Sequence, residues 1–183
     1  MSEQRLDDVF GAAQAGQPWA LRALYDELAP RVHGYVRSRG AAEPEGVTSE
    51  VFLAVFPRLA TVTGGAAGLK TLVFSVAHAR LVDDLRRRSR REPTVEYDAL
   101  TDLRAAPSSE EQALALIATA SVRELLSGLP DDQRNVLLLR IVADLSLEQV
   151  AEAIGRSPGA VKQLQRRGLL ALRARGASAG VPP

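Results

Sequence analysis

The fold is decided by residues 129–175, LPDDQRNVLLLRIVADLSLEQVAEAIGRSPGAVKQLQRRGLLALRAR. Ser146 is expected to begin a helix with a capping box, because Gln149 follows three residues later and the segment has an apolar helical period. Gly155 ends that helix, and Ser157, in front of a proline, begins the next one. A capped helix, a short turn and a second capped helix predict a helix-turn-helix.

The last helix of this stretch, expected at about 158–173, has an apolar face and a basic face. At 3.6 residues per turn, the apolar side chains from Val161 to Leu172 fall on one side. From Arg156 to Arg175 the chain has Arg or Lys at six positions and no acid. Such a face suits the major groove of DNA, so the pattern predicts nucleic-acid binding. The candidate DNA-binding residues are Ser157, Gly159, Lys162, Gln163, Arg166 and Arg167.

A second interpretation of the same stretch stays open. Many small helical bundles contain a capped helix, a glycine turn and another amphipathic helix, and a run of charge is often only a solvated face. On that interpretation residues 129–175 form a structural or partner-binding helical hairpin.

The composition favours helices and excludes several kinds of site. Aromatic residues make up 4% of the 183 residues, so the core must be built mainly from Leu, Val, Ile and Ala. The absence of cysteine excludes disulfides, thiolate zinc sites and a cysteine nucleophile. The first residues lack the layout of a signal peptide, and no apolar run has membrane-spanning length, so a cytoplasmic protein without a membrane segment is expected.

The chain is expected to be all-α, with two small helical domains joined by a flexible acidic linker and a helix-turn-helix at the end of the second. The first domain comprises residues 19–91 and contains a Gly-rich loop at 61–68. The linker, residues 92–112, carries six acids and one Arg and has no helical period. The second domain comprises residues 113–175. The first dozen residues are expected to be weakly ordered, and in the free state mainly the linker should hold the two domains together, unless a partner clamps them.

Three helices are expected in the first domain, and prolines disturb two of them. Pro30 should kink or split the helix at 19–39, and Pro57 should weaken the last turn of the helix at 44–59. The third helix, at about 69–88, ends in a basic run.

Nothing in the sequence indicates catalysis, a cofactor or a bound metal. The Gly-rich loop lacks the GxxxxGK[ST] spacing of a nucleotide-binding loop. His33 and His78 lie on separate helices without a second ligand nearby, and Ser75 and His78 lack a supporting acid. The chain is therefore expected not to be an enzyme.

Segments from both domains resemble, in order, the sigma factors of bacterial RNA polymerase of the extracytoplasmic-function class, in the sigma-70 family. In the first domain, LRALYDELAPRVHGYVRSR and TSEVFLAVFPRL look like the core-polymerase-binding helices, and LVFSVAHARLVDDLRRRSRR looks like the helix that follows the promoter-melting loop. In the second domain, LP-x-x-QR and S-P-G-A-V-K keep the spacing of the family's reader of the upstream promoter element. The resemblance covers roughly residues 19–175.

The resemblance implies a transcription initiation factor that binds RNA polymerase core, directs it to promoter DNA and assists strand opening. The first domain would be the region 2-like domain, and its loop 61–70 would capture a flipped base of the −10 element. The second would be the region 4-like domain, whose helix 158–173 enters the major groove of the −35 element. An anti-sigma factor is a further implied partner. The implied −10 residues are Thr63, Lys70, His78, Arg80, Arg86 and Arg87, and the implied polymerase contacts are Ser49, Glu50, Leu53, Phe56 and Arg58.

The first domain departs from the family pattern at three places. Leu72 replaces a Trp, Ala79 replaces a common Asn, and the usual acidic stretch before TSEVF is AAEPEG here. These differences concern the details of −10 recognition and strand opening. Two rival functions are a stand-alone helix-turn-helix regulator, which would need a dimer interface or effector pocket, and an adaptor that binds only proteins.

Overall fold

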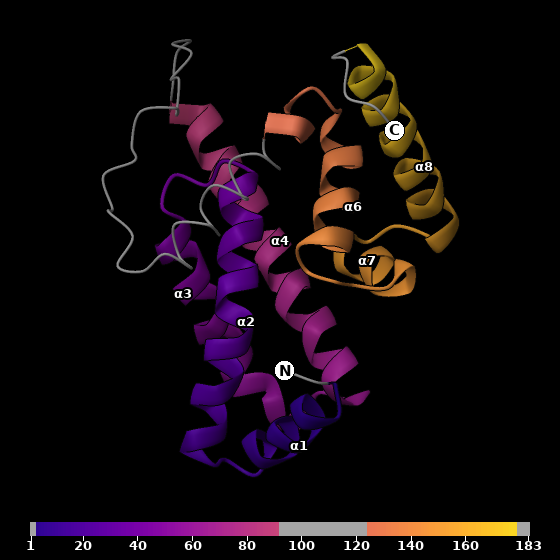
Figure 1. The fold of residues 1–183 in the computed structure, drawn as a ribbon. Helices are drawn as coiled ribbons and strands as arrows, with labels where there is room; N and C mark the ends of the chain where they lie inside the picture. The colour runs from indigo at the N-terminus through magenta and orange to yellow at the C-terminus, as the bar shows by residue number, and fades with distance from the viewer. Residues whose placement is uncertain (1–2, 92–123, 179–183) are drawn as a thin grey trace, which may run out of the picture.

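The computed structural model describes residues 3–91 and 124–178, and these residues form helices without a strand (Figure 1). The all-α fold expected from the sequence is confirmed, while the linker at 92–112 lies outside the described residues. The first bundle consists of α1 (Glu3–Gln14), α2 (Pro18–Ser38), α3 (Pro44–Val55), the 3-10 helix η1 (Phe56–Thr61) and α4 (Gly65–Arg91). The second consists of α6 (Asp131–Ile141), α7 (Leu147–Ile154) and α8 (Pro158–Ser178), preceded by helical residues 124–127.

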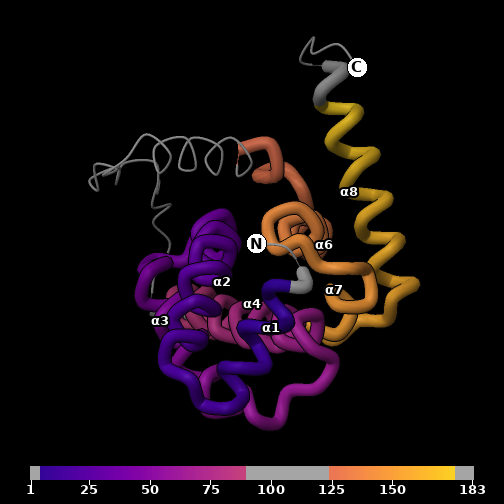
Figure 2. Tube along the Cα trace, turned by 60° about the horizontal axis from the view of Figure 1, so that its bottom comes forward, coloured from indigo at the N-terminus to yellow at the C-terminus, as the bar shows by residue number. Residues whose placement is uncertain are grey.

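Helix α1 corrects the expectation that the first dozen residues are weakly ordered. Its side chains Leu6, Val9, Phe10 and Ala13 are buried in the core of the first bundle. Their spacing places all four on one face of a helix, so the signal was present in the sequence. Figure 2 shows α1 lying across the end of this bundle, where it contacts α2, α4 and η1.

The two prolines have different effects on their helices. Helix α2 continues through Pro30 as one element, so the predicted split does not occur. Pro57 has no N–H with which to bond the preceding turn, and the chain passes from α-helix to 3-10 helix at Phe56, beside it. The expected weakening of the last turn is therefore confirmed.

The helix-turn-helix begins and ends its helices as the sequence predicts. Ser146 Oγ accepts a hydrogen bond from the Gln149 backbone N–H at 3.2 Å, and Gln149 Oε1 accepts one from the Ser146 N–H at 2.7 Å. Gly155 follows α7 in the left-handed conformation, with φ of 64°. Ser157 Oγ accepts from the N–H of Ala160 at 3.2 Å and so caps α8. Both helices are thus fixed by local contacts.

The two domains pack directly on each other, which corrects the expectation that mainly the linker holds them together. Helix α7 lies against α4, and α6 reaches α2 (Figures 1 and 2). Arg39 Nη1 and Asp131 Oδ1 form an ion pair at 3.2 Å between the domains, and the Arg39 side chain is 5% exposed. Gln149 Nε2 donates to the carbonyl oxygen of Ala67 at 2.9 Å. We call this arrangement the closed state.

Candidate nucleic-acid and polymerase interfaces

The basic face of α8 is open to solvent. All six residues predicted to bind the upstream element are exposed, whereas Val161 and Gly168 on the opposite face are buried against the second bundle. A Cβ on Gly168 would lie 2.9 Å from Leu137 Cδ1, so this glycine lets α8 approach α6 closely. The Ser157 hydroxyl is engaged as the helix cap, which makes it a positioning group at the start of the helix. Lys162, Gln163, Arg166 and Arg167 present free polar ends on one helix.

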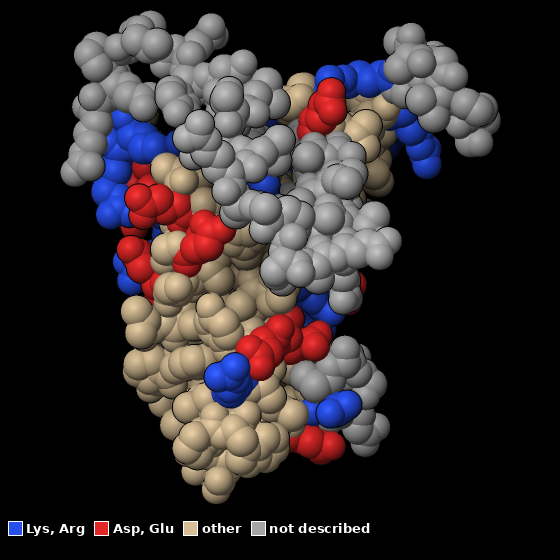
Figure 3. All heavy atoms as spheres, turned by 60° about the vertical axis from the view of Figure 1, so that its left-hand side comes forward, with Lys and Arg blue, Asp and Glu red and all other residues tan. Residues whose placement is uncertain are grey.

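The residues predicted to bind the −10 element are only partly brought together. Thr63, in the loop before α4, and the arginines Arg80, Arg86 and Arg87 are exposed, and Lys70 is half-buried. On a helix of 3.6 residues per turn, Arg80 and Arg87 share a face that does not include His78. Figure 3 shows Lys and Arg side chains gathered toward the upper end of α4, with acidic side chains just below them.

Like Lys70, His78 is not fully exposed, and its ring bonds to a buried side chain of another helix. It is half-buried, and its Nδ1 atom is hydrogen-bonded to the Tyr35 hydroxyl at 2.9 Å. Burial, and to a smaller extent the charge of Arg39, lower the pKa of His78, while Asp132 on α6 acts in the opposite direction. Burial also raises the pKa of Tyr35, so that side chain stays a neutral phenol. His78 is therefore a neutral interior group in the closed state.

The loop before α4 has a conformation that depends on three glycines. Gly64 and Gly65 have φ of 82° and 61°, which other residues rarely adopt. A Cβ on Gly68 would lie 1.9 Å from the Thr63 carbonyl oxygen, so the loop can fold back onto the helix only with glycine at this position. The conformation of the loop that carries Thr63 therefore requires glycine at these positions.

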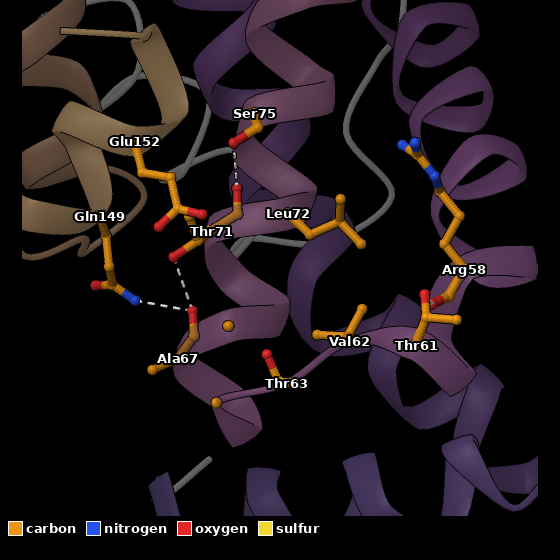
Figure 4. A pocket seen from close by; sticks show the side chains of 12 residues that line it. Arg58, Thr61, Val62, Thr63, Ala67, Thr71, Leu72, Ser75, Gln149 and Glu152 are labelled. Carbon is orange, nitrogen blue, oxygen red and sulfur yellow. Dashed lines mark hydrogen bonds between the residues drawn. The ribbon is translucent and has the colours of Figure 1, made fainter.

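An open cavity of about 620 Å³ lies beside this loop (Figure 4). One wall is the loop itself and the segment before it, and a second is the α4 face that carries Thr71 and Ser75. Both hydroxyls donate to their own helix, to the carbonyls of Ala67 and Thr71 respectively. The third wall comes from the other domain, because Gln149 and Glu152 of α7 also line the cavity. No local sequence signal indicates this wall, since α7 and α4 meet only in the folded chain.

The predicted polymerase contacts lie on α3 and continue into η1. Leu53 is 75% exposed, and Ser49, Glu50 and Arg58 are exposed too. Phe56 is half-buried in η1, and its ring lies 5.5 Å from that of the buried Phe52, so its role in packing competes with a contact role. Figure 3 shows a broad uncharged area on the side of the molecule that α2 and α3 form. The exposed large apolar side chains of these two helices are Trp19, Tyr25 and Leu53.

Among residues 3–91 and 124–178, no group of three His, Cys, Asp or Glu side chains could hold a metal ion. None of the described helices has the length and apolar character needed to cross a membrane.

This chain is similar to known proteins both in its second domain and over nearly its whole length. A family model described as sigma-70, region 4 matches residues 125–174. The ECF RNA polymerase sigma factor SigD of Mycobacterium tuberculosis is 33% identical over 180 residues, covering 94% of this chain and 84% of SigD. The ECF sigma factor ShbA of Streptomyces griseus is 31% identical over 173 residues, covering 88% of this chain and 90% of ShbA.

One solved structure extends the comparison to the fold. The structure of CnrH in complex with the cytosolic domain of CnrY aligns with a TM-score of 0.67 and 18% sequence identity. The alignment covers 94% of this chain and 97% of that chain, so the arrangement of both helical domains is alike over nearly their full length.

Proposed function

Because the chain belongs to the extracytoplasmic-function sigma factors of RNA polymerase, we propose that its two domains recognise the two elements of one promoter. The protein is a transcription initiation factor that directs polymerase to promoters. In the proposed division, residues 19–91 with the added helix α1 bind polymerase core and the −10 element. Residues 113–175 bind the −35 element, and residues 92–112 link the two domains.

Helix α8 is proposed to enter the major groove of the −35 element. Its exposed face offers the cationic side chains Lys162, Arg166 and Arg167 and the amide of Gln163, which are the groups that contact phosphates and base edges. The capped start of α8 supplies backbone N–H groups and a positive dipole end, which also favour a phosphate. The observation that carries this assignment is the acid-free, fully exposed basic face.

The cavity beside the loop is proposed to take the flipped base of the −10 element. The loop conformation requires its glycines, and the neighbouring cavity has polar edges at Thr63 and Arg58 and an apolar wall at Leu72. A base in a separated strand can be recognised in such a pocket by its edge and its flat face. Arg80, Arg86 and Arg87 are proposed to follow the phosphates of that strand.

The closed state cannot engage both promoter elements at once. Elements about 25 base pairs apart are separated by about 85 Å along B-form DNA. Helix α7 contacts α4 and α8 together, so the cavity and the recognition helix lie on neighbouring elements. In addition, Glu152 places a carboxylate at the edge of the cavity that the base would enter. We infer that α7 leaves α4 when polymerase is bound.

The partners follow from the same assignment. RNA polymerase core is proposed to bind the surface around Leu53, with Ser49, Glu50 and Arg58 at its edge. By family resemblance, an anti-sigma factor is proposed to cover such surfaces until a signal arrives. The protein is proposed to act in the cytoplasm, and the nucleotide-joining chemistry is assigned to the polymerase, without a catalytic centre or cofactor in this chain.

A run-off transcription assay with core polymerase and a random promoter pool tests the proposal. Selected promoters should share two separated sequence elements, and transcription should require both this chain and core polymerase. If the chain selects DNA equally well without polymerase, the stand-alone regulator is supported instead. If no DNA is selected while the chain copurifies with another protein, the adaptor is supported.

A further inference from the structure

Two polar side chains of α1 bond to the backbone of the loop region rather than to their own helix. Asp7 Oδ1 accepts a hydrogen bond from the N–H of Ala66 at 2.5 Å. Gln14 Nε2 donates to the carbonyl oxygens of Leu59 and Val62, each at 2.9 Å. Asp7 and Gln14 are seven residues apart, which places them on the same face of α1 two turns from each other.

The Asp7 contact supplies a cap that α4 lacks in its own sequence. Helix α4 begins at Gly65 and has no acid in its first turn. The carboxylate of Asp7 satisfies a backbone N–H there and lies at the positive end of the helix dipole. The contact is close, because a Cβ on Gly65 would lie 2.6 Å from Asp7 Oδ1. The start of α4, and with it the end of the loop, is thus fixed from another helix.

The Gln14 contacts fix the other end of the loop. The Leu59 and Val62 carbonyls belong to the last turn of η1 and to the residue before Thr63. Val62 and Thr63 both line the cavity, so the hydrogen bonds of Gln14 position this part of the cavity wall. Attachment of α1 to the bundle does not require these bonds, since Leu6, Val9, Phe10 and Ala13 already bury its apolar face.

We propose that Asp7 and Gln14 are positioning residues for −10 recognition, which set the shape of the base-binding loop from behind without touching DNA. The inference rests on the proposed role of the loop in capturing a base. The inference gives α1 a role in promoter specificity. If the two ends of the loop shift by a fraction of an ångström, the hydrogen-bonding groups that the base meets change position. Loss of either contact lowers discrimination between bases more than it lowers affinity for DNA.

The test uses polymerase holoenzyme and single-stranded oligonucleotides that carry the −10 element selected by run-off transcription, with each of the four bases at each position. Gln14→Glu keeps the size of the side chain and removes both donors, and Asp7→Ala removes the acceptor. Asp7→Asn keeps an acceptor oxygen and should preserve the wild-type preference. Matched controls are Asp8→Ala and Gln17→Ala, which remove exposed side chains of the same chemistry nearby.

Asp7→Ala should reduce the ratio of binding between the preferred base and the others by about two- to tenfold, the range for one hydrogen bond. Gln14→Glu loses two hydrogen bonds and should reduce this ratio at least as much. The controls should leave this ratio unchanged, and binding to a duplex −35 element and to core polymerase should stay at the wild-type level.

If the wild type discriminates but both variants keep its ratios, the inference is overturned while the function of the loop stands. Equal weakening for all bases and for the −35 duplex, with a lower melting temperature, shows a merely structural role and also overturns it. Absence of discrimination by the wild type contradicts the proposed loop function itself.

Discussion

Gly34 of α2 faces Val142, the residue that follows α6, across the boundary between the domains. A Cβ on Gly34 would lie 3.4 Å from Val142 Cγ1, which is an ordinary van der Waals distance with no room beyond it. Both residues are only half-buried, so the contact lies at the margin of the interface. A larger side chain here must push α6 away from α2.

We therefore expect Gly34→Leu to open the closed state. The extra side chain overpacks the boundary, at a cost of about 1–3 kcal/mol that separation of the domains relieves. The radius of gyration of the free protein, measured by small-angle X-ray scattering, should increase. Gly34→Ala is the matched control, because its Cβ fits and Ala favours a helix. An unchanged radius for Gly34→Leu would contradict the closed state as the main form in solution.

The double variant Lys162→Ala, Arg166→Ala should weaken binding to the −35 element. Each lost phosphate contact lowers the slope of log affinity against log salt by about 0.9, and a lost bidentate base contact costs about 1–3 kcal/mol. Fluorescence anisotropy of a labelled −35 duplex at several salt concentrations measures both effects. Arg22→Ala serves as the control, since this Arg is 83% exposed on α2 and pairs with Asp26. The same affinity and slope as the wild type would place the DNA contact elsewhere.

Leu53→Asp should abolish binding to polymerase core in a pull-down. The side chain is 75% exposed, so its replacement should change the free energy of unfolding by no more than about 0.5 kcal/mol. Val51→Asp, two residues away, places a carboxylate at a position that is 0% exposed and should unfold the bundle instead. If Leu53→Asp also strongly lowers the melting temperature, the side chain stabilises the fold and is not a contact with polymerase.

His78 should make the stability of the fold sensitive to mild acid. Its pKa is lowered in the folded protein, chiefly by burial, so the unfolded chain takes up a proton first as the pH falls. The free energy of unfolding should therefore decrease from about pH 6.5, the ordinary histidine value, down to the pKa of the folded state. Urea unfolding at pH 7.5 and pH 5.5 measures this loss. His78→Gln should reduce it, whereas His33→Gln should leave the contribution of His78 in place.

The parts of the fold that depend on neighbours in sequence could be predicted from the sequence. The capping box at Ser146, the left-handed Gly155 and the Ser157 cap involve residues within four positions of each other, and each was located correctly. The same holds for the basic face of α8, because helical periodicity alone assigns it.

Features that depend on distant contacts could not be predicted in this way. The contact of His78 with Tyr35 joins positions 43 residues apart, so no local pattern predicts it. The wall of the cavity formed by Gln149 and Glu152 depends on how the domains dock, and no motif encodes that. Helix α1 is a different case, because the apolar period of Leu6, Val9, Phe10 and Ala13 is visible in the sequence and is enough to predict a buried helical face.

Gln149 uses both ends of one amide, and this has a consequence for the kinetics of opening. Its Oε1 atom closes the cap of α7, while its Nε2 atom holds Ala67 of α4. When the domains separate, the Oε1 bond within α7 is retained, and water replaces the Ala67 carbonyl as the partner of Nε2. The net cost of this exchange is only about 0.5–1.5 kcal/mol. The helix that leaves is as ordered after departure as before. We therefore expect the domains to open by separation of folded helices rather than by local unfolding. The lifetime of the closed state should then change little between variants that alter helix propensity alone.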